Sequence, residues 1–127
     1  MIFSLENKVV IITGGSSGIG RAISILFAQQ GAEVHIFDLQ SPLSDDTISE
    51  VQQFSKNSKF HPVDITNEQL VLAEINALNI VDILINNAGS LINKPFNETS
   101  TADLAEMLES NVISHFKMIQ HTLPLLN

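Results

Sequence analysis

The chain has 127 residues, of which 44% are hydrophobic and 16% charged, and this ordinary globular composition fits one folded domain. Six basic residues against 14 acidic ones give a net charge of -8, which argues against nucleic acid as a partner because duplex binding depends on neutralising phosphates. The chain has no cysteine, no apolar run near the roughly 20 residues that span a bilayer and no signal-like N-terminus, so we expect a soluble, cytoplasmic protein.

The first third of the chain predicts a strand, a helix and a second strand. Residues 8–13 form a continuous apolar run that ends at glycines, as in a buried strand. A helix is predicted over residues 17–30, and Gly31 suits the left-handed position just past its end. Residues 33–38 predict the second strand. The apolar residues at helical spacing in the helix are Ile19, Ile23, Leu26 and Phe27.

The next segment predicts a turn, a modest helix and an edge strand. Residues 39–46 are polar and rich in turn formers, so the helix is expected near residues 46–56. Residues 59–64 resemble a short third strand. Pro62 indicates an edge position for it, because proline cannot donate to a central ladder.

A third helix, a fourth strand and a long final helix complete the pattern. Thr66 and Gln69 have the spacing of a capping box, so a helix is expected to open there and run to about Leu78. Residues 80–86 predict a fourth buried strand. Strand and helix thus occur four times, which predicts an α/β fold, half of a doubly wound parallel sheet. A long amphipathic helix over residues 101–124 has on one side Leu104, Leu108, Phe116, Ile119 and Leu123.

Three glycines between the first strand and the first helix carry the first functional signal. Gly14, Gly18 and Gly20 are spaced as G-x-x-x-G-x-G, which differs from the general G-x-G-x-x-G dinucleotide fingerprint. Free backbone N–H groups and the positive end of the helix favour a phosphate at such a place. The alternative is a plain tight turn, and we interpret the loop as phosphate-binding.

An aspartate closes the second predicted strand. Asp38 lies about 20 residues beyond the glycine loop, where an acidic residue can accept hydrogen bonds from an adenosine ribose; the alternative is an aspartate that caps the turn. Its charge would repel a 2'-phosphate, and no basic residue follows, since Leu39 and Gln40 come next. The loop and Asp38 together predict NAD in preference to NADP as the cofactor.

Two further motifs lie at the ends of the later strands. Asp64-Ile65 follows the third strand, and Asn86-Asn87-Ala88-Gly89 follows the fourth. Together with Asp38 and with Thr13-Gly14-x-x-x-Gly18-x-Gly20, they resemble the classical short-chain dehydrogenase/reductase family, in order and spacing, over all 127 residues. The resemblance implies a Rossmann-like doubly wound parallel sheet, truncated after about four strands and four helices.

The resemblance also implies roles for these residues. The family hydrogen-bonds the adenine amino group at the Asp64 position, packs Ile65 on the ring and passes the ribose closely at the Asn-Asn-Ala-Gly turn. Without the family, Asp64 would equally be a helix-flanking aspartate and the turn an ordinary strand ending. The implied cofactor-binding residues are Thr13, Gly14, Ser16, Ser17, Gly18, Ile19, Gly20, Asp38, Asp64, Ile65, Asn87, Ala88 and Gly89.

One asparagine of the long helix becomes a catalytic candidate through the family. Asn111 by itself is interpreted as solvent-facing, because asparagine is a poor helix former. The family has an asparagine at this position that holds a water in a proton relay. The four histidines have no spacing with carboxylates that would indicate a metal site, so none is predicted.

The implied chemistry is hydride transfer between an alcohol or carbonyl carbon and the nicotinamide. In the family a tyrosinate acts as general base, aided by a lysine four residues later and by a serine. This sequence contains no tyrosine and ends before the strand and helix that would carry those groups. We therefore expect residues 1–127 to be an incomplete NAD(P)-binding Rossmann-fold domain that keeps the adenosine half of the cofactor site and lacks the catalytic half.

Two kinds of function remain open. The first is an oxidoreductase acting on alcohols or carbonyl compounds, of which this chain is the N-terminal half. The alternative is a non-catalytic NAD-binding or interaction module, or an inactive truncated remnant. In the family's strand order, 3-2-1-4-5-6-7, the fourth strand would be an unpaired apolar edge here. We expect a homo-oligomer or aggregate that associates through this strand and the helix over residues 101–124.

Overall fold

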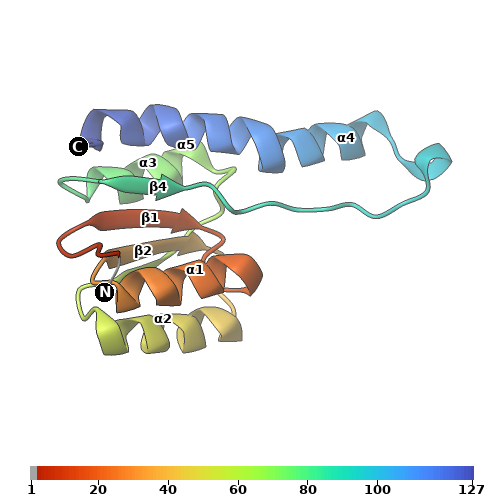
Figure 1. Ribbon diagram of the computed structural model, residues 1–127. Helices are drawn as coiled ribbons and strands as arrows, with labels where there is room; N and C mark the ends of the chain where they lie inside the picture. Colours follow the sequence, from red (N-terminus) through yellow and green to blue (C-terminus); the bar gives the residue numbers. More distant parts are fainter. Residues whose placement is uncertain (1–2) are drawn as a thin grey trace.

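Four parallel strands form a single sheet in the computed structural model, which describes residues 3–127. The first two residues of the predicted domain 1–127 lie outside the described residues. The strand order is β3-β2-β1-β4, so the chain reverses its winding direction around β1 (Figure 1). The predicted α/β fold with a Rossmann-like parallel sheet is confirmed. The strands are β1 (Val9–Thr13), β2 (Glu33–Asp38), β3 (Lys59–Pro62) and β4 (Ile83–Ile85).

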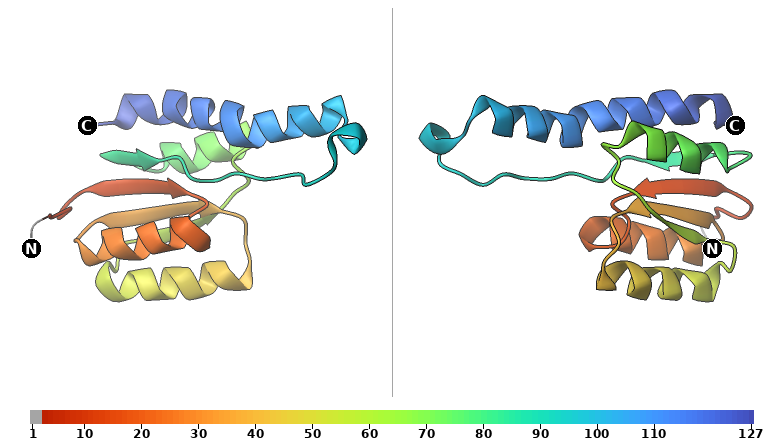
Figure 2. Two further views of the ribbon diagram at one scale, coloured as in Figure 1. Left: turned by 45° about the vertical axis from the view of Figure 1, so that its right-hand side comes forward. Right: turned by 180° about the vertical axis from the view of Figure 1, so that it is seen from behind.

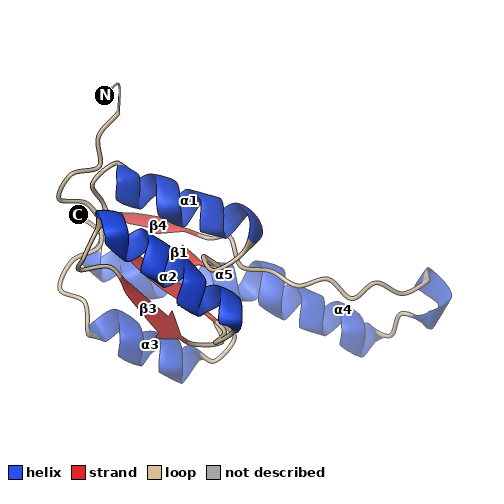
Figure 3. Cartoon of the chain, turned by 90° about the horizontal axis from the view of Figure 1, so that it is seen from below, coloured by secondary structure: helices blue, strands red, loops and turns tan. Residues whose placement is uncertain are grey.

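Helices cover both faces of this sheet. α1 and α2 lie side by side on one face, and α3 and α5 pack on the other (Figures 1 and 3). α4 extends beyond the sheet, together with the loop that follows β4 (Figure 2). No helix within residues 3–127 has the length and apolar character needed to cross a membrane. The helices are α1 (Gly18–Gln29), α2 (Pro42–Phe54), α3 (Glu68–Asn76), α4 (Thr101–Leu108) and α5 (Ser114–Thr122).

Two hydrophobic cores follow from the alternation of side chains along the central strands. Val10 and Ile12 of β1 belong to the core under α1 and α2, whereas Ile11 belongs to the core under α3 and α5. β2 lies in parallel register with β1 and divides its residues in the same way, with Ile36 in the first core and Phe37 in the second. Burial on both faces explains why β1 is a nearly continuous apolar run.

Helix α1 packs on the sheet through small residues with larger apolar ones beside them. Gly20, Ser24 and Ala28 are its buried positions, and they follow one another at intervals of four residues. Of the predicted apolar residues, Ile23 and Phe27 are partly buried against the first core, whereas Ile19 and Leu26 are exposed. Small side chains let the helix backbone lie close to the sheet, so the apolar residues of the sequence mark the buried face only in part.

Helix α2 begins earlier than predicted. Pro42 occupies its first turn, and Ser41 and Ser44 form a reciprocal capping box in which the Ser44 N–H donates to Ser41 Oγ at 3.3 Å. Proline is favourable at this position because its missing N–H would have no partner there. The turn predicted over residues 39–46 is therefore wrong beyond its first residues.

Helix α3 uses a different cap from the predicted one. Asn67 is the N-cap, and its Oδ1 accepts a hydrogen bond from the Leu70 N–H at 3.2 Å. Thr66 instead donates its hydroxyl to Asp64 Oδ1 at 2.7 Å, so the predicted capping box between Thr66 and Gln69 is wrong. The Thr66 hydroxyl is engaged in the local turn with Asp64, so the next polar residue, Asn67, caps the helix.

The two edges of the sheet are β3 and β4. The prediction from Pro62 that the third strand is an edge strand is confirmed. β4 is shorter than the predicted range 80–86 and is only half-buried, because it pairs with β1 alone among residues 3–127. Val81 lies outside the strand and forms a bridge with Leu126. The predicted fully buried fourth strand is therefore wrong in length and burial, whereas its expected position as an open edge is confirmed.

The long helix predicted over residues 101–124 contains a π-helical turn. This turn spans Glu109–Ile113 and joins α4 to α5 in one continuous helical path (Figure 2). A short 3-10 turn precedes α4 at Phe96–Glu98, and another follows α5 at Leu123–Leu125. The apolar residues predicted to lie on one side are all exposed: Leu104, Leu108, Phe116, Ile119 and Leu123.

Candidate functional site

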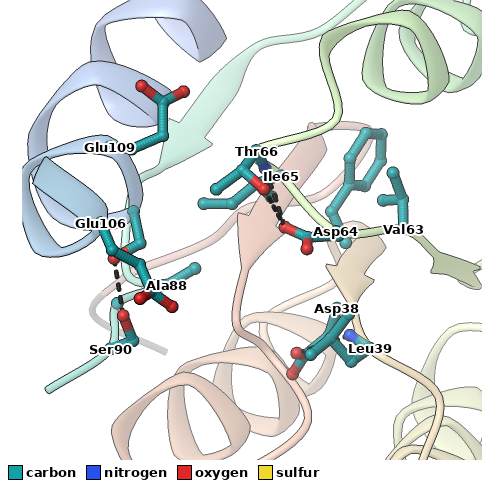
Figure 4. Close-up of a pocket in the computed structure, with 13 residues that line it drawn as sticks. Asp38, Leu39, Val63, Asp64, Ile65, Thr66, Ala88, Ser90, Glu106 and Glu109 are labelled. Atoms are coloured by element: carbon teal, nitrogen blue, oxygen red, sulfur yellow. Dashed lines mark hydrogen bonds between the residues drawn. The ribbon is translucent and has the colours of Figure 1, made fainter. Parts of the chain in front are cut away.

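The carboxyl ends of the strands border a cavity of about 440 Å³. It lies beyond the ends of β2, β3 and β4, at the edge where open α/β sheets bind their ligands. Residues of α4 and of the π-helical turn line its other side (Figure 4). The structure brings together at this cavity five of the residues predicted to bind the cofactor, namely Asp38, Asp64, Ile65, Ala88 and Gly89.

The glycine loop joins β1 to α1 in a conformation that requires glycine. Gly14 has φ +64°, a left-handed conformation, and a Cβ placed on it would come within 2.9 Å of the Ala88 Cα. A Cβ on Gly20 would overlap the Gly14 carbonyl oxygen. The loop thus packs backbone against backbone, which leaves no room for side chains between it and the turn after β4.

Two predicted residues tie the glycine loop to the turn after β4. Thr13 Oγ1 accepts the N–H groups of Asn87 and Ala88, both at 3.0 Å. In return, Asn87 Nδ2 donates to the Gly14 carbonyl at 3.0 Å. These hydrogen bonds fix the two loops that flank the point where the strand order reverses.

The remaining predicted loop residues differ in exposure. Ser16 is buried, and its Oγ has no hydrogen-bond partner in the part of the chain that the structure describes. Ser17 is the N-cap of α1 and makes no side-chain cap bond, and Gly18 and Ile19 begin the helix in exposed positions. The first N–H groups of α1 therefore lack intrahelical partners, as an anion site at a helix N-terminus requires.

Asp38 both caps the end of β2 and faces the cavity. Its Oδ2 accepts the Ser16 N–H at 3.1 Å, and its Oδ1 accepts the Leu39 N–H at 2.8 Å. Each carboxylate oxygen keeps lone-pair capacity beyond these bonds. The two interpretations of Asp38 from the sequence are thus compatible, because the same carboxylate holds the turn and lines the cavity (Figure 4).

Asp64 and Ile65 form the cavity wall after β3. Asp64 Oδ1 accepts hydrogen bonds from the Thr66 N–H at 2.9 Å and the Thr66 hydroxyl at 2.7 Å, which fixes the carboxylate in a local turn. Ile65 is half-buried and lines the cavity beside it (Figure 4). The pair therefore presents one acceptor group and one apolar surface to the cavity.

Two glutamates at the cavity were missed by the sequence analysis. Glu106 and Glu109 line it from α4 and the π-helical turn, opposite Asp38 and Asp64 (Figure 4). Their spacing of three residues places them on one helix side, but nothing local indicates what that side faces. No lysine, arginine or histidine within residues 3–127 lines the cavity. The wall of the cavity is therefore strongly negative. This charge favours ligand groups that donate hydrogen bonds and disfavours a phosphate group inside the cavity.

Asn111 lies outside the cavity lining and joins the long helix to the loop after β4. Its Nδ2 donates to the Ser90 carbonyl at 2.7 Å, and its Oδ1 accepts the Ser90 N–H at 2.9 Å. The residue is half-buried, so its interpretation as solvent-facing is wrong. A Cβ on Gly89 would overlap Asn111 Oδ1, so the close approach of the two segments depends on this glycine.

A chain of four ionisable side chains on the α3 side of the sheet was also missed. His35 Nδ1 and His61 Nε2 lie 2.8 Å apart. Glu33 Oε1 lies 2.7 Å from His35 Nε2, and Glu74 Oε2 lies 2.7 Å from His61 Nδ1. Burial is the main cause of a lowered pKa for His35, and the hydrogen bond to Glu33 opposes it. Residues 3–127 contain no group of three or more metal-ligating side chains arranged to hold an ion.

Comparison with known sequences connects the chain to one family. Residues 8–127 match the family described as short chain dehydrogenase. The 7alpha-hydroxysteroid dehydrogenase of Escherichia coli is 39% identical over 124 residues, which cover 94% of this chain and 48% of that protein. The cyclopentanol dehydrogenase of Comamonas testosteroni is 34% identical over 119 residues, which cover 88% of this chain and 46% of that protein. The chain spans about half the length of these curated relatives.

Solved structures of similar proteins share the fold. A hydroxysteroid dehydrogenase from Escherichia coli has a TM-score of 0.86 and 38% identity, and the match covers 95% of this chain and 53% of that one. A 7 alpha-hydroxysteroid dehydrogenase in complex with NADH and 7-oxo glycochenodeoxycholic acid has a TM-score of 0.87 and 37% identity, with 96% and 49% covered. Both likenesses extend over nearly all of this chain.

Proposed function

Because this chain belongs to the short-chain dehydrogenase family, we propose that it forms the cofactor-binding half of an oxidoreductase that transfers hydride between NAD and an alcohol or carbonyl substrate. The observation that carries the proposal is the meeting of Asp38, Asp64 and the Ala88–Gly89 turn at one cavity beside the glycine loop. In this arrangement the adenosine lies in the cavity and the pyrophosphate lies over the loop, at the N-terminus of α1.

The residues present fit such a cofactor. The glycine loop faces open space at Gly18, and the N–H groups at the start of α1 have no intrahelical partner. The buried Ser16 Oγ adds a polar atom without a partner among residues 3–127. Around the adenosine, Asp64 would accept from the adenine amino group while Ile65 packs on the ring. Thr13 and Asn87 would hold the two loops that enclose the dinucleotide.

Charge supports NAD in preference to NADP. Asp38 would accept hydrogen bonds from the ribose hydroxyls, and its charge would repel a 2'-phosphate at the same place. Glu106 and Glu109 add to the negative potential of the same cavity. A nearby basic residue, which would neutralise a 2'-phosphate, is missing from the described lining.

The bound nicotinamide would supply hydride acceptance or donation, and the proton steps require further groups. We assign Asn111 to the proton relay as a candidate catalytic residue, because Oδ1 keeps a second lone pair beyond its bond to Ser90. The 127 residues contain no tyrosine to act as the general base. The chain alone therefore binds NAD without turnover, as an incomplete NAD(P)-binding domain, and the reacting groups come from polypeptide outside these residues.

We also propose that copies of the chain associate through the open edge of β4 and the long helix. β4 pairs with β1 on one side only, within the described part of the chain. The exposed apolar residues of α4 and α5 continue this surface toward the end of the helix. Unpaired strand edges and large exposed apolar patches both favour association.

A thermal melt of the protein with excess NAD, with excess NADP and without cofactor tests the proposed function. A ligand at a hundredfold its Kd that binds only the folded state adds about 2.7 kcal/mol of stability, which shifts the melting temperature visibly. We expect NAD to raise the transition and NADP to leave it nearly unchanged. A transition indifferent to both cofactors would contradict the proposal. NAD-linked oxidation of simple alcohols by this chain alone would contradict the proposed division of the catalytic groups.

A further inference from the structure

Three successive carbonyl groups of the glycine loop are each held by a side chain from a different element. The carbonyls belong to residues 14–16. Asn87 Nδ2 donates to the first at 3.0 Å, Ser24 Oγ to the second at 3.0 Å and Thr47 Oγ1 to the third at 2.8 Å. All three carbonyls therefore point into the protein, toward the turn after β4, α1 and α2 in turn.

The direction of these carbonyls decides where the loop N–H groups point. In a trans peptide, the C=O of one residue and the N–H of the next are coplanar and point in opposite directions. With the carbonyls of residues 14–16 turned inward, the N–H groups of residues 15–17 face the other way. The Ser16 N–H shows this directly, because it donates to Asp38 Oδ2 on the cavity side of the loop.

The hydroxyl of Thr47 has only one possible direction for its proton. Thr47 is fully buried on α2, and its Oγ1 lies 2.6 Å from Arg21 Nη1. A guanidinium can only donate, so the threonine oxygen accepts a hydrogen bond from Arg21. The threonine O–H therefore donates to the Ser16 carbonyl. Glu50 holds the other end of the guanidinium, with Oε2 at 2.6 Å from Arg21 Nη2. Arg21 and Glu50 thus orient the hydroxyl that holds the loop.

We propose that Thr47 is a positioning residue of the cofactor site, whose hydroxyl keeps the Ser16 carbonyl turned inward and the following N–H groups turned toward the cofactor pyrophosphate. The proposal rests on the proposed function, since the pyrophosphate is that of the proposed NAD. No spacing in the sequence indicates it, because Thr47 lies 31 residues beyond Ser16 and on another helix. The proposed cofactor site thus extends from the glycine loop to α2.

Two substitutions at Thr47 and one elsewhere separate positioning from ordinary packing. Thr47→Val keeps the shape and removes the hydroxyl, whereas Thr47→Ser keeps the hydroxyl and removes a methyl group. Thr122→Val is the matched control, because Thr122 is also fully buried and its hydroxyl also donates to a backbone carbonyl, that of Met118 at 2.7 Å. The measurements are the amide chemical shift of Ser17, whose N–H shares a peptide plane with the Ser16 carbonyl, by NMR in the ligand-free protein, and the Kd for NAD by calorimetry.

We expect Thr47→Val to change the amide chemical shift of Ser17 and to raise the Kd for NAD by about fivefold, the effect of one lost neutral hydrogen bond. Thr47→Ser should restore both values to near those of the wild type, and Thr122→Val should change neither. An equal change of the Ser17 amide shift in Thr47→Val and Thr122→Val would overturn the proposal. So would an equal effect of Thr47→Ser and Thr47→Val, since the methyl group and not the hydroxyl would then matter.

A second variant keeps the test decisive if Thr47→Val does not fold. Arg21→Met removes the donor that orients the threonine hydroxyl, at a half-exposed position on α1 where methionine is a good helix former. We expect the Ser17 amide shift to change by a smaller amount than in Thr47→Val, and an unchanged shift would overturn the proposal. If the wild type binds no NAD, the proposed function fails, and the Ser17 amide shifts in the ligand-free protein still decide the role of Thr47.

Discussion

We propose that Asp38 combines a structural role with recognition of the ribose, and Asp38→Asn tests the second role. The amide oxygen still accepts the Ser16 N–H, whereas the bond from the Leu39 N–H is lost and the charge is removed. We expect the Kd for NAD to rise about tenfold through loss of charged hydrogen bonds to the ribose, and NADP to bind more tightly than to the wild type. Calorimetric titration with both cofactors measures the ratio. Asp45→Asn, an exposed carboxylate of α2, is the control, and an unchanged ratio in Asp38→Asn would contradict the assigned role.

The histidine pair lies between two carboxylates on the α3 side of the sheet. Contacts of hydrogen-bond length run from Glu33 through His35 and His61 to Glu74. Burial is the main cause of the lowered pKa of His35, and the neighbouring groups His61 and Lys59 add to it. Protonation of His35 is therefore disfavoured in the folded state.

We therefore expect the protein to lose stability as the pH falls below about 6.5. The folded-state pKa of His35 is lowered, so below the ordinary value the unfolded chain binds more protons, and the free energy of unfolding decreases until the folded pKa is reached. Urea unfolding at several pH values measures the slope. His35→Phe should have a shallower slope than the wild type, whereas His121→Gln, which alters an ion pair with Glu68 on the surface, serves as the control. Equal slopes for His35→Phe and the wild type would contradict this assignment.

At the scale of single residues, the motifs predicted most of the candidate site and none of its wider surroundings. The glycine loop, Asp38, Asp64 and the turn after β4 each follow a strand, so their meeting at one edge follows from parallel strands. Glu106 reaches the cavity only because α4 extends over it, and Thr47 reaches the loop across the contact of α1 with α2. Such contacts join distant segments through tertiary packing, which local spacing does not encode.

At the scale of elements, Asn67 provides a test of the corrected start of α3. Its side chain caps the helix, whereas Thr66 bonds only to Asp64. We expect Asn67→Ala to lower the free energy of unfolding by about 1 kcal/mol, the usual cost of a lost N-cap. Thr66→Ala should cost less, because the helix keeps its cap. Urea unfolding curves compare the two, and a larger loss for Thr66→Ala would restore the original prediction of the capping box.

The strands were easier to predict from the sequence than the faces and ends of the helices. β2 coincides with the predicted range 33–38, because its buried residues Val34, Ile36 and Phe37 form a short apolar run with high strand propensity. The buried face of α1 was not evident, since Gly20 and Ser24 pack closely through their small size while Ile19 is left exposed. The start of α2 was missed because Pro42 indicates a turn as readily as the first turn of a helix.

At the scale of the whole molecule, the exposed apolar side of the long helix predicts self-association. Phe116 and Ile119 lie exposed on α5, away from the sheet's own cores. We expect the wild type to elute above its monomer mass in light-scattering chromatography, and Phe116→Glu combined with Ile119→Lys to shift it toward the monomer. Leu43→Glu, at an equally exposed apolar residue of α2, is the control and should change nothing. A strictly monomeric wild type at high concentration would contradict the proposed association.

The π-helical turn at Glu109–Ile113 also sets how this helix tolerates a change of length. Phe116 lies eight positions after Leu108, and in a regular α-helix this step would turn the side chain about 80° beyond two full turns. The π-helical turn absorbs about one residue, so the two side chains return to the same side of the helix. Deleting a single residue there would leave a regular helix with the same outer stripe, and the bonds of Ser110 and Asn111 to Ser90 would be disturbed. The exposed apolar side of the helix would therefore tolerate one residue fewer, whereas the contact with the loop after β4 depends on the extra residue.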